Sequence, residues 1–232
     1  MSDFMKNDIF DLVNITDQEP EFIPLISEEE EENMNKEAVP EILPILPLRN
    51  NTLFPGVVIP ITVGRDKSIK LIEDAYAKDK TIGVVSQIEP EIEEPVAADL
   101  HKIGTVAHII KKLKMPDGST TIIIQGKKRF EVDTIIQEEP YFKAMVTGLI
   151  DEKLDMSIEK NKALVSTIKD MALKIIKESP NIPSEASFAI KNIESATFLV
   201  NFIASNLNGE VDKKQTLLQT NNIEQRIEQV LA

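Results

Sequence analysis

The sequence predicts an α+β protein, in which a barrel-like or sandwich β domain with one helix precedes an α-helical bundle. Two observations predict this order. Seven of the eight glycines lie within residues 42–150, among short β-branched runs, which is typical of many strands joined by tight turns. From residue 151 onward, apolar residues recur at three- and four-residue steps, which is typical of helices. The predicted divisions are therefore 1–41, 42–150 and 151–232.

The first segment, residues 1–41, is strongly acidic. It carries 13 acidic residues and two lysines, so −11 of the chain's net charge of −13 lies there. The five adjacent glutamates at 28–32 repel one another and offer no apolar face, so we expect a disordered, mobile tail that keeps the protein soluble. The alternative is that its small apolar islands are docking motifs for a partner.

The second segment is read as short strands between turn residues. The clearest pairing is a hairpin around Asp117-Gly118, because Asp-Gly between two apolar runs is a strong hairpin signal. Pro47 and Pro60 confine the first two strands to sheet edges or bulges, because proline has no N–H for a ladder. The predicted strands cover 45–48, 57–63, 81–87, 103–113, 120–125, 130–136 and 141–149, with one helix over 66–78.

The third segment predicts a bundle of short helices over 164–175, 186–190, 196–207, 213–219 and 223–231. Asn221, three residues before Glu224, resembles a capping box at the start of the last helix. That helix pattern runs to Ala232 with no stop signal. We therefore expect either a fragment whose last helix continues into a further module, or a last helix that docks on the bundle.

The composition leaves little room for catalysis. Cysteine is absent, and the two histidines, His101 and His108, are interpreted as ordinary surface or half-buried residues. The stretch 118–128 lacks the glycine and Ser/Thr positions of a phosphate-binding loop. We expect no cofactor or metal in this chain. Apolar stretches too short for a bilayer and the lack of a secretory signal favour a cytoplasmic protein.

Basic residues flank the predicted hairpin. If its strands pair across 116–118, Lys111 lies opposite Ile123 or Ile124, and Lys127 lies opposite about Ala107. This stripe has three interpretations: a site for nucleic-acid phosphates or an acidic partner, a solvated edge that discourages strand pairing, or a resting place for the protein's own acidic tail. The candidate basic patch comprises Lys111, Lys112, Lys114, Lys127, Lys128 and Arg129.

Several short motifs, in this order and spacing, resemble the amino-terminal domain of the Lon protease family. The resemblance covers about residues 42–232 and does not include the acidic segment. The motifs are Leu46-Pro47-Leu48-Arg49, Phe54-Pro55-Gly56, Ile59-Pro60, Val63-Gly64-Arg65, Ser68-Ile69, Ile103-Gly104-Thr105-Val106-Ala107, Leu113-Lys114-Met115-Pro116-Asp117-Gly118, and Gly126 with Arg129.

The resemblance implies a PUA-like β domain and a helical bundle that together recognise unfolded, damaged or tagged proteins. It also implies that these parts help to pair subunits above a hexameric ATPase ring. The parent protein would use ATP and Mg²⁺ and would carry a Ser-Lys peptidase module. The ATPase module and the peptidase module are both absent from these 232 residues, so this chain alone is expected to be noncatalytic.

The candidate contact residues follow from the motifs. Leu48, Phe54 and Met115 are expected to be exposed, because a domain that holds unfolded chains needs apolar patches that it does not bury. Arg49 and Arg65 are interpreted as satisfying loop carbonyls or pairing with nearby acids, with substrate contact as the alternative. The candidate substrate- or partner-binding residues are Leu48, Arg49, Phe54, Pro55, Arg65 and Met115.

The resulting hypothesis is a noncatalytic recognition region of an ATP-dependent protease that captures exposed apolar segments through weak, multivalent contacts. Two alternatives stay open: a free-standing adaptor of the same fold, and an RNA- or DNA-binding module that uses the basic patch.

Overall fold

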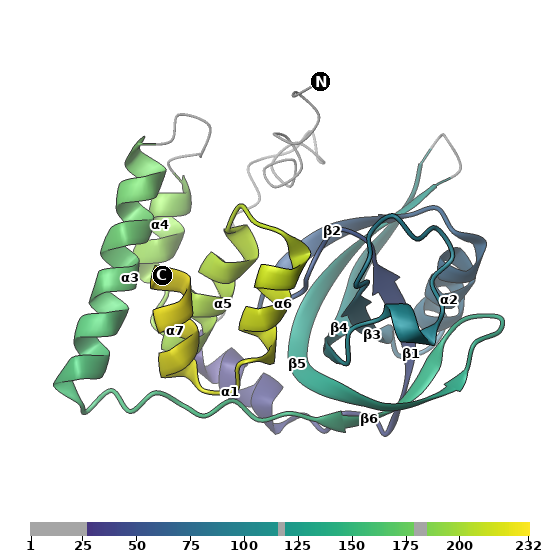
Figure 1. Ribbon diagram of the computed structural model, residues 1–232, viewed down its shortest axis with the longest axis horizontal. Helices are drawn as coiled ribbons and strands as arrows, with labels where there is room; N and C mark the ends of the chain where they lie inside the picture. Colours follow the sequence, from purple (N-terminus) through teal and green to yellow (C-terminus); the bar gives the residue numbers. More distant parts are fainter. Residues whose placement is uncertain (1–26, 116–118, 179–184) are drawn as a thin grey trace.

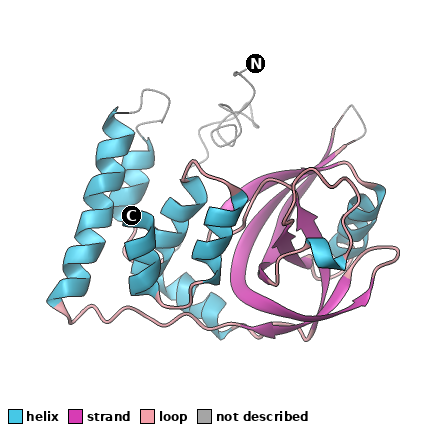
Figure 2. Ribbon diagram, in the orientation of Figure 1, coloured by secondary structure: helices cyan, strands magenta, loops and turns pink. Residues whose placement is uncertain are grey.

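The computed structural model describes residues 27–115, 119–178 and 185–232. A ring of strands lies on one side of the molecule and a bundle of helices on the other (Figure 1). Figure 2 shows that most helices gather at one end, whereas α2 and a short helical turn lie against the strands. An α+β class, with strands first and helices second, is confirmed.

The strand part is one six-stranded sheet in the order β2-β5-β4-β3-β1-β6, with a further pairing between β5 and β6. Because β6 pairs with both β1 and β5, five strands form a closed circuit of pairings, to which β2 is attached. The strands are β1 (Ile42–Leu48), β2 (Val58–Val63), β3 (Thr81–Ser86), β4 (Ile103–Lys114), β5 (Thr120–Gln137) and β6 (Lys143–Gly148).

β5 is a single long strand, whereas the sequence predicted two strands divided at Gly126. One of its edges pairs with β4. The other edge pairs first with β2, over 120–125, and then with β6, over 130–137. Gly126 is not a break but a point of close approach, because an added Cβ would lie 2.3 Å from the carbonyl oxygen of Phe54.

The two prolines expected at sheet edges occupy different places. Pro60 lies in the edge strand β2, as predicted. Pro47 lies in β1, which is flanked by β3 and β6, so the edge prediction for this strand is wrong. β6 pairs only with Ile42, Leu43 and Pro44 of β1, so the described ladder leaves Pro47 paired on the β3 side alone, and its missing N–H is tolerated.

The helical part agrees closely with the periodicity. Its last helix begins after Asn222, whose side chain accepts from the backbone N–H of Gln225 at 3.0 Å, so the N-cap is one residue later than predicted. The strand part also holds a short 3₁₀ turn, Ala97–Asp99. The helices are α2 (Asp66–Tyr76), α3 (Glu159–Glu178), α4 (Glu185–Asn192), α5 (Ala196–Asn206), α6 (Val211–Gln219) and α7 (Ile223–Leu231).

The acidic block forms a helix, α1 (Glu28–Lys36), which corrects the prediction of a disordered tail over 1–41 for its last part. Ser27 accepts from the N–H of Glu30 at 3.2 Å, and the Glu30 carboxylate accepts from the Ser27 N–H at 2.9 Å. This capping box, with acids near the N-terminus and Lys36 in the last turn, offsets the repulsion between glutamates. The prediction for 1–26 lies outside the described residues.

The apolar core runs without interruption from the strands into the bundle. The main cluster joins strand residues such as Ile109 and Ile122 to helix residues such as Leu199 and Ile227, all fully buried. A second cluster fills the strand ring around Phe130. No helix within the described residues is long and apolar enough to cross a membrane.

Candidate functional site

The loop between β1 and β2 turns inward, so the prediction that Leu48 and Phe54 are exposed is wrong. Their side chains are 3% and 0% exposed. Gly56, at φ 83°, allows the turn, and its N–H donates to the carbonyl of Gly126 at 2.9 Å. Motif residues that resembled a binding loop therefore form part of the core.

The other loop residues divide between interior and surface. Pro55 is half-buried, and its carbonyl accepts a hydrogen bond from the Asn201 side chain on α5 at 3.3 Å. Arg49 is exposed at the end of β1. Pro55 therefore helps to join the strands to the bundle, and only Arg49 of this pair faces solvent.

Arg65 is held by the loop that follows β3. Its guanidinium donates to the side-chain oxygen of Gln87 at 2.8 Å and to the carbonyl of Ile92 at 3.4 Å. Burial lowers the pKa of Arg65, and the charge of Arg49 lowers it further, while Glu94 and Glu93 oppose the shift. The interpretation of Arg65 as a residue that satisfies loop carbonyls is confirmed.

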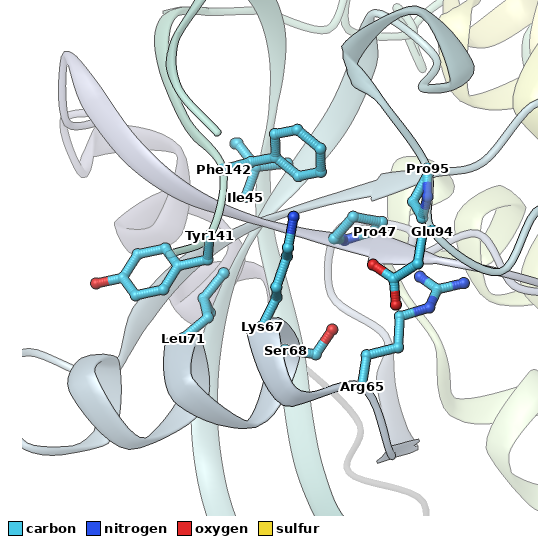
Figure 3. A pocket seen from close by; sticks show the side chains of 10 residues that line it. All are labelled: Ile45, Pro47, Arg65, Lys67, Ser68, Leu71, Glu94, Pro95, Tyr141 and Phe142. Atoms are coloured by element: carbon cyan, nitrogen blue, oxygen red, sulfur yellow. The ribbon is translucent and has the colours of Figure 1, made fainter. Parts of the chain in front are cut away.

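Arg65 lines a small hollow between β1, the start of α2 and the loops at 94–95 and 141–142. Figure 3 shows Lys67 lying between Tyr141 and Pro47, with Glu94 beside Arg65. Lys67 donates to Glu139 at 2.6 Å. The hollow measures about 20 Å³, which is roughly the space of one ordered water.

The six basic residues of the candidate patch do not form one surface. Lys111, Lys112 and Lys114 stay at the hairpin end of β4, and Lys111 pairs with Ile123 as predicted. Ala107 pairs with Gly126 instead of Lys127, because the extra residue Ile110 in β4 shifts the register by one residue. Lys127 and Lys128 face α1, and Arg129 is 1% exposed, which contradicts its place in an accessible patch.

The hairpin end brings exposed apolar and cationic side chains together. We call this the hairpin surface: Ile110, Lys111, Lys112, Lys114 and Met115. A register shift between Ile109 and Lys111 makes Ile110 an extra, unpaired residue, and its side chain is 48% exposed. Met115, just after the end of β4, is 41% exposed, as predicted.

A hollow of about 120 Å³ lies beneath this surface, between the hairpin and α2. Two isoleucines and two lysines are among its lining residues, and the Lys112 ammonium lies 5.1 Å from the centre of the Tyr76 ring. This arrangement suits shallow contact with an apolar, acidic polypeptide segment. Its lining residues are Ile69, Ile72, Glu73, Lys112, Lys114 and Thr120.

Sequence reasoning missed Ile110 and the α2 side of the hollow. One signal was present, because two adjacent isoleucines on a strand, Ile109 and Ile110, point to opposite faces. The position of the bulge and the packing of α2 depend on tertiary contacts, which the local pattern does not contain.

A buried ionic cluster joins the strand part to the bundle. Asp151, just after β6, accepts from Arg129 at 2.6 Å and from Arg226 of α7 at 2.8 Å, both through Oδ1. Arg129 also donates to the carbonyl of Leu218 at 2.8 Å, and Arg226 to the Asn201 side chain at 2.7 Å. Burial lowers the pKa of Arg129, Asp151 raises it, and Arg226 lowers it further.

The acidic helix α1 lies against β5 (Figure 1), as the third interpretation of the basic stripe predicted. The Lys128 ammonium donates to the carbonyl of Asn35, in the last turn of α1, at 3.1 Å. The pKa of Glu30 is lowered mainly by hydrogen bonds from Ser27, with a smaller contribution from the charge of Lys127. Met34 is the α1 anchor, at 6% exposed.

The histidines lie apart from one another. His101 Nε2 is 3.6 Å from Asp212 Oδ1 on α6, and burial lowers its pKa while Asp212 opposes the shift. Burial also lowers the pKa of His108, followed by the charges of Lys127 and Lys80. Within the described part of the chain, no three His, Cys, Asp or Glu side chains are placed to hold a metal ion.

A closed circuit of strands fixed to a helical bundle, with an apolar and cationic hairpin end, defines a two-part module built for binding. Residues 42–232 match the ATP-dependent protease La (LON) substrate-binding domain family. The chain therefore belongs to this family, which confirms the resemblance seen in the sequence.

Two longer relatives and a solved structure agree with this family assignment. The chain is 58% identical to a Lon protease of Flavobacterium johnsoniae, over 90% of this chain and 26% of that protein, and 51% identical to one of Cytophaga hutchinsonii over the same shares. It thus spans about a quarter of these relatives. The N-terminal domain of Mycobacterium avium complex Lon protease has the same fold, with a TM-score of 0.67, 18% identity, and coverage of 82% of this chain and 96% of that one.

Proposed function

We propose that this chain is the noncatalytic substrate-recognition and subunit-association region of a cytoplasmic, ATP-dependent Lon-type serine protease. Its substrates are unfolded or damaged proteins. ATP, Mg²⁺ and the Ser-Lys peptidase belong to the remaining three-quarters of the parent, which assembles as a homohexamer. The family assignment supports this proposal, as does the closed circuit of strands, which suits a PUA-like β-barrel.

The hairpin surface is the observation that carries the recognition role. Ile110 and Met115 expose about half of their side chains beside three lysines, at the end of a hairpin. An apolar patch left open in this way is typical of protein-binding surfaces. One such contact is weak, but several subunits that hold one polypeptide multiply the affinity and still allow the polypeptide to be released for translocation.

A titration with one model protein in folded and permanently unfolded forms tests this function. We expect the chain to bind the unfolded form in preference. The double variant Ile110→Ser/Met115→Ser should lose about tenfold in affinity, because two half-exposed apolar side chains contribute on the order of 1.4 kcal/mol together. Fluorescence anisotropy of the labelled unfolded protein measures the change.

The matched control is Met156→Ser, because Met156 is 42% exposed, like Met115, but lies in the linker before α3. This variant should bind as the unchanged chain does. Equal affinity for folded and unfolded forms would remove the recognition role and leave subunit association alone. An unchanged affinity in the double variant would remove the hairpin surface from the site.

The nucleic-acid alternative loses part of its basis, because Arg129 is buried and Lys128 contacts α1. Salt-dependent binding of short RNA that is lost in the variant Lys127→Glu/Lys128→Glu would support this alternative. The absence of such binding at low salt would exclude it.

A further inference from the structure

The described contact between α1 and β5 combines one buried apolar side chain with cationic ones. Among the α1 residues whose exposure is described, Met34 alone is buried. Around it, Lys128 reaches the carbonyl of Asn35. Lys127 is close enough to Glu30 to lower the pKa of that carboxyl, after the larger effect of the Ser27 hydrogen bonds.

These contacts define both the charge of the groups that the β5 surface binds and the spacing between those groups. Glu30 and Met34 are four residues apart, so they lie on the same face of α1. Lys128 meets the C-terminal turn, where the carbonyls of a helix attract a cation. The surface on β5 therefore recognises a carboxylate, an apolar side chain one turn later, and a helix C-terminus.

The same features make α1 easy to displace. A helix of nine residues is marginal by itself, and most of the α1 side chains with a described exposure face solvent. Exposed charge pairs are weakened by salt, so a single buried methionine provides most of the anchoring. Segments of this kind open locally while the rest of the domain stays folded.

We propose that the β5 surface around Lys127 and Lys128 is a docking site for acidic helical segments of other polypeptides, and that α1 is its built-in competitor. The site is separate from the hairpin surface, so it stands whether or not the hairpin surface binds substrate. The chain that follows α1 is short and fixed, since Val39 packs against Gly148 and the Glu41 carbonyl accepts from Val146 at 3.0 Å. A short tether gives α1 a high effective concentration over the site.

A labelled peptide with the sequence of residues 27–37, added to the full chain, tests the proposal. The unchanged chain should bind it weakly, because α1 occupies the site. The variant Met34→Ser should bind it about tenfold more tightly if α1 covers the site about nine-tenths of the time, because the competitor is then released. Binding should weaken at high salt.

Two lysine pairs provide the matched comparison. In the Met34→Ser chain, Lys127→Ala/Lys128→Ala should abolish peptide binding, while Lys174→Ala/Lys177→Ala, at exposed positions of α3, should leave it unchanged. A peptide with serine in place of methionine should not bind. Hydrogen exchange of the α1 amides should speed up in Met34→Ser, with the amides of β4 and β5 still protected.

Three results would overturn the proposal. The first is equal peptide affinity for the unchanged and Met34→Ser chains. The second is peptide binding that does not change when Lys127 and Lys128 are replaced by alanine. The third is a short RNA that binds at these lysines where the peptide does not, which would assign the surface to nucleic acid.

Discussion

Among single residues, Asp151 has the largest structural consequence. It is the carboxylate shared by two guanidiniums that are 1% and 0% exposed, Arg129 and Arg226. Charges taken out of water need a partner, and removal of that partner costs more than the pair contributes on its own. Asp151 therefore contributes to the joint between the two parts of the molecule, beside the continuous apolar core.

Asp151→Asn should lower the free energy of unfolding by about 3–5 kcal/mol, because two buried cations lose their counter-ion. Urea denaturation followed by circular dichroism measures the change. Asp170→Asn, at an exposed position of α3, is the control and should change stability little. If both variants lose the same stability, the ionic cluster is not a major contributor.

Gly126 makes a second residue-level prediction. An added Cβ would lie 2.3 Å from the carbonyl oxygen of Phe54, which is backbone and cannot swing aside. Gly126→Ala should therefore cost about 1–3 kcal/mol in stability by overpacking. Thermal unfolding checks this against Gly64→Ala, where an added Cβ meets nothing within 4 Å. A Gly126→Ala chain as stable as Gly64→Ala would contradict the close approach.

Among elements, the regular strands and helices could be predicted because their signals are local. Alternation and β-branched runs placed β2, β3 and β4 within a residue or two of their observed bounds, and three- and four-residue periodicity placed α2 and the helices from α3 to α7. Asp117-Gly118 correctly indicated the β4–β5 hairpin register at Lys111.

The misses arose where a long-range contact decides the outcome. The glutamates of α1 suggested disorder, but a capping box and the lysines of β5 favour a helix. Gly126 suggested a break within β5, although it serves a close approach by a loop seventy residues earlier in the chain. Phe54 and Arg129 suggested an exposed site, yet their partners come from the core and from Asp151. No local pattern contains these partners.

For the whole molecule, the interface between strands and bundle gives a pH dependence. The pKa of His101, next to α6, lies below its usual value because of burial, and so does that of His108. At pH values between these lowered pKa values and about 6.5, the unfolded chain binds more protons than the folded chain. The free energy of unfolding therefore has its full value above about pH 6.5 and decreases as the pH falls below 6.5.

Urea denaturation at several pH values across this range tests the dependence. The unchanged chain should keep its stability between about pH 7.5 and 6.5 and lose it as the pH is lowered further towards 5.5. The double variant His101→Gln/His108→Gln should show a flatter curve, because its side chains do not titrate. A slope that is the same in both chains would assign the effect to the carboxylates.

The continuity of β5 has a mechanical consequence. A single strand runs from the hairpin end at Thr120 to Arg129, a span of roughly 30 Å without an intervening loop. A force applied at the hairpin is thus carried along one continuous strand to Arg129, whose guanidinium binds Asp151 and the carbonyl of Leu218 in α6. The strands and helices should therefore move together under a force applied at the hairpin, instead of bending where the two parts meet.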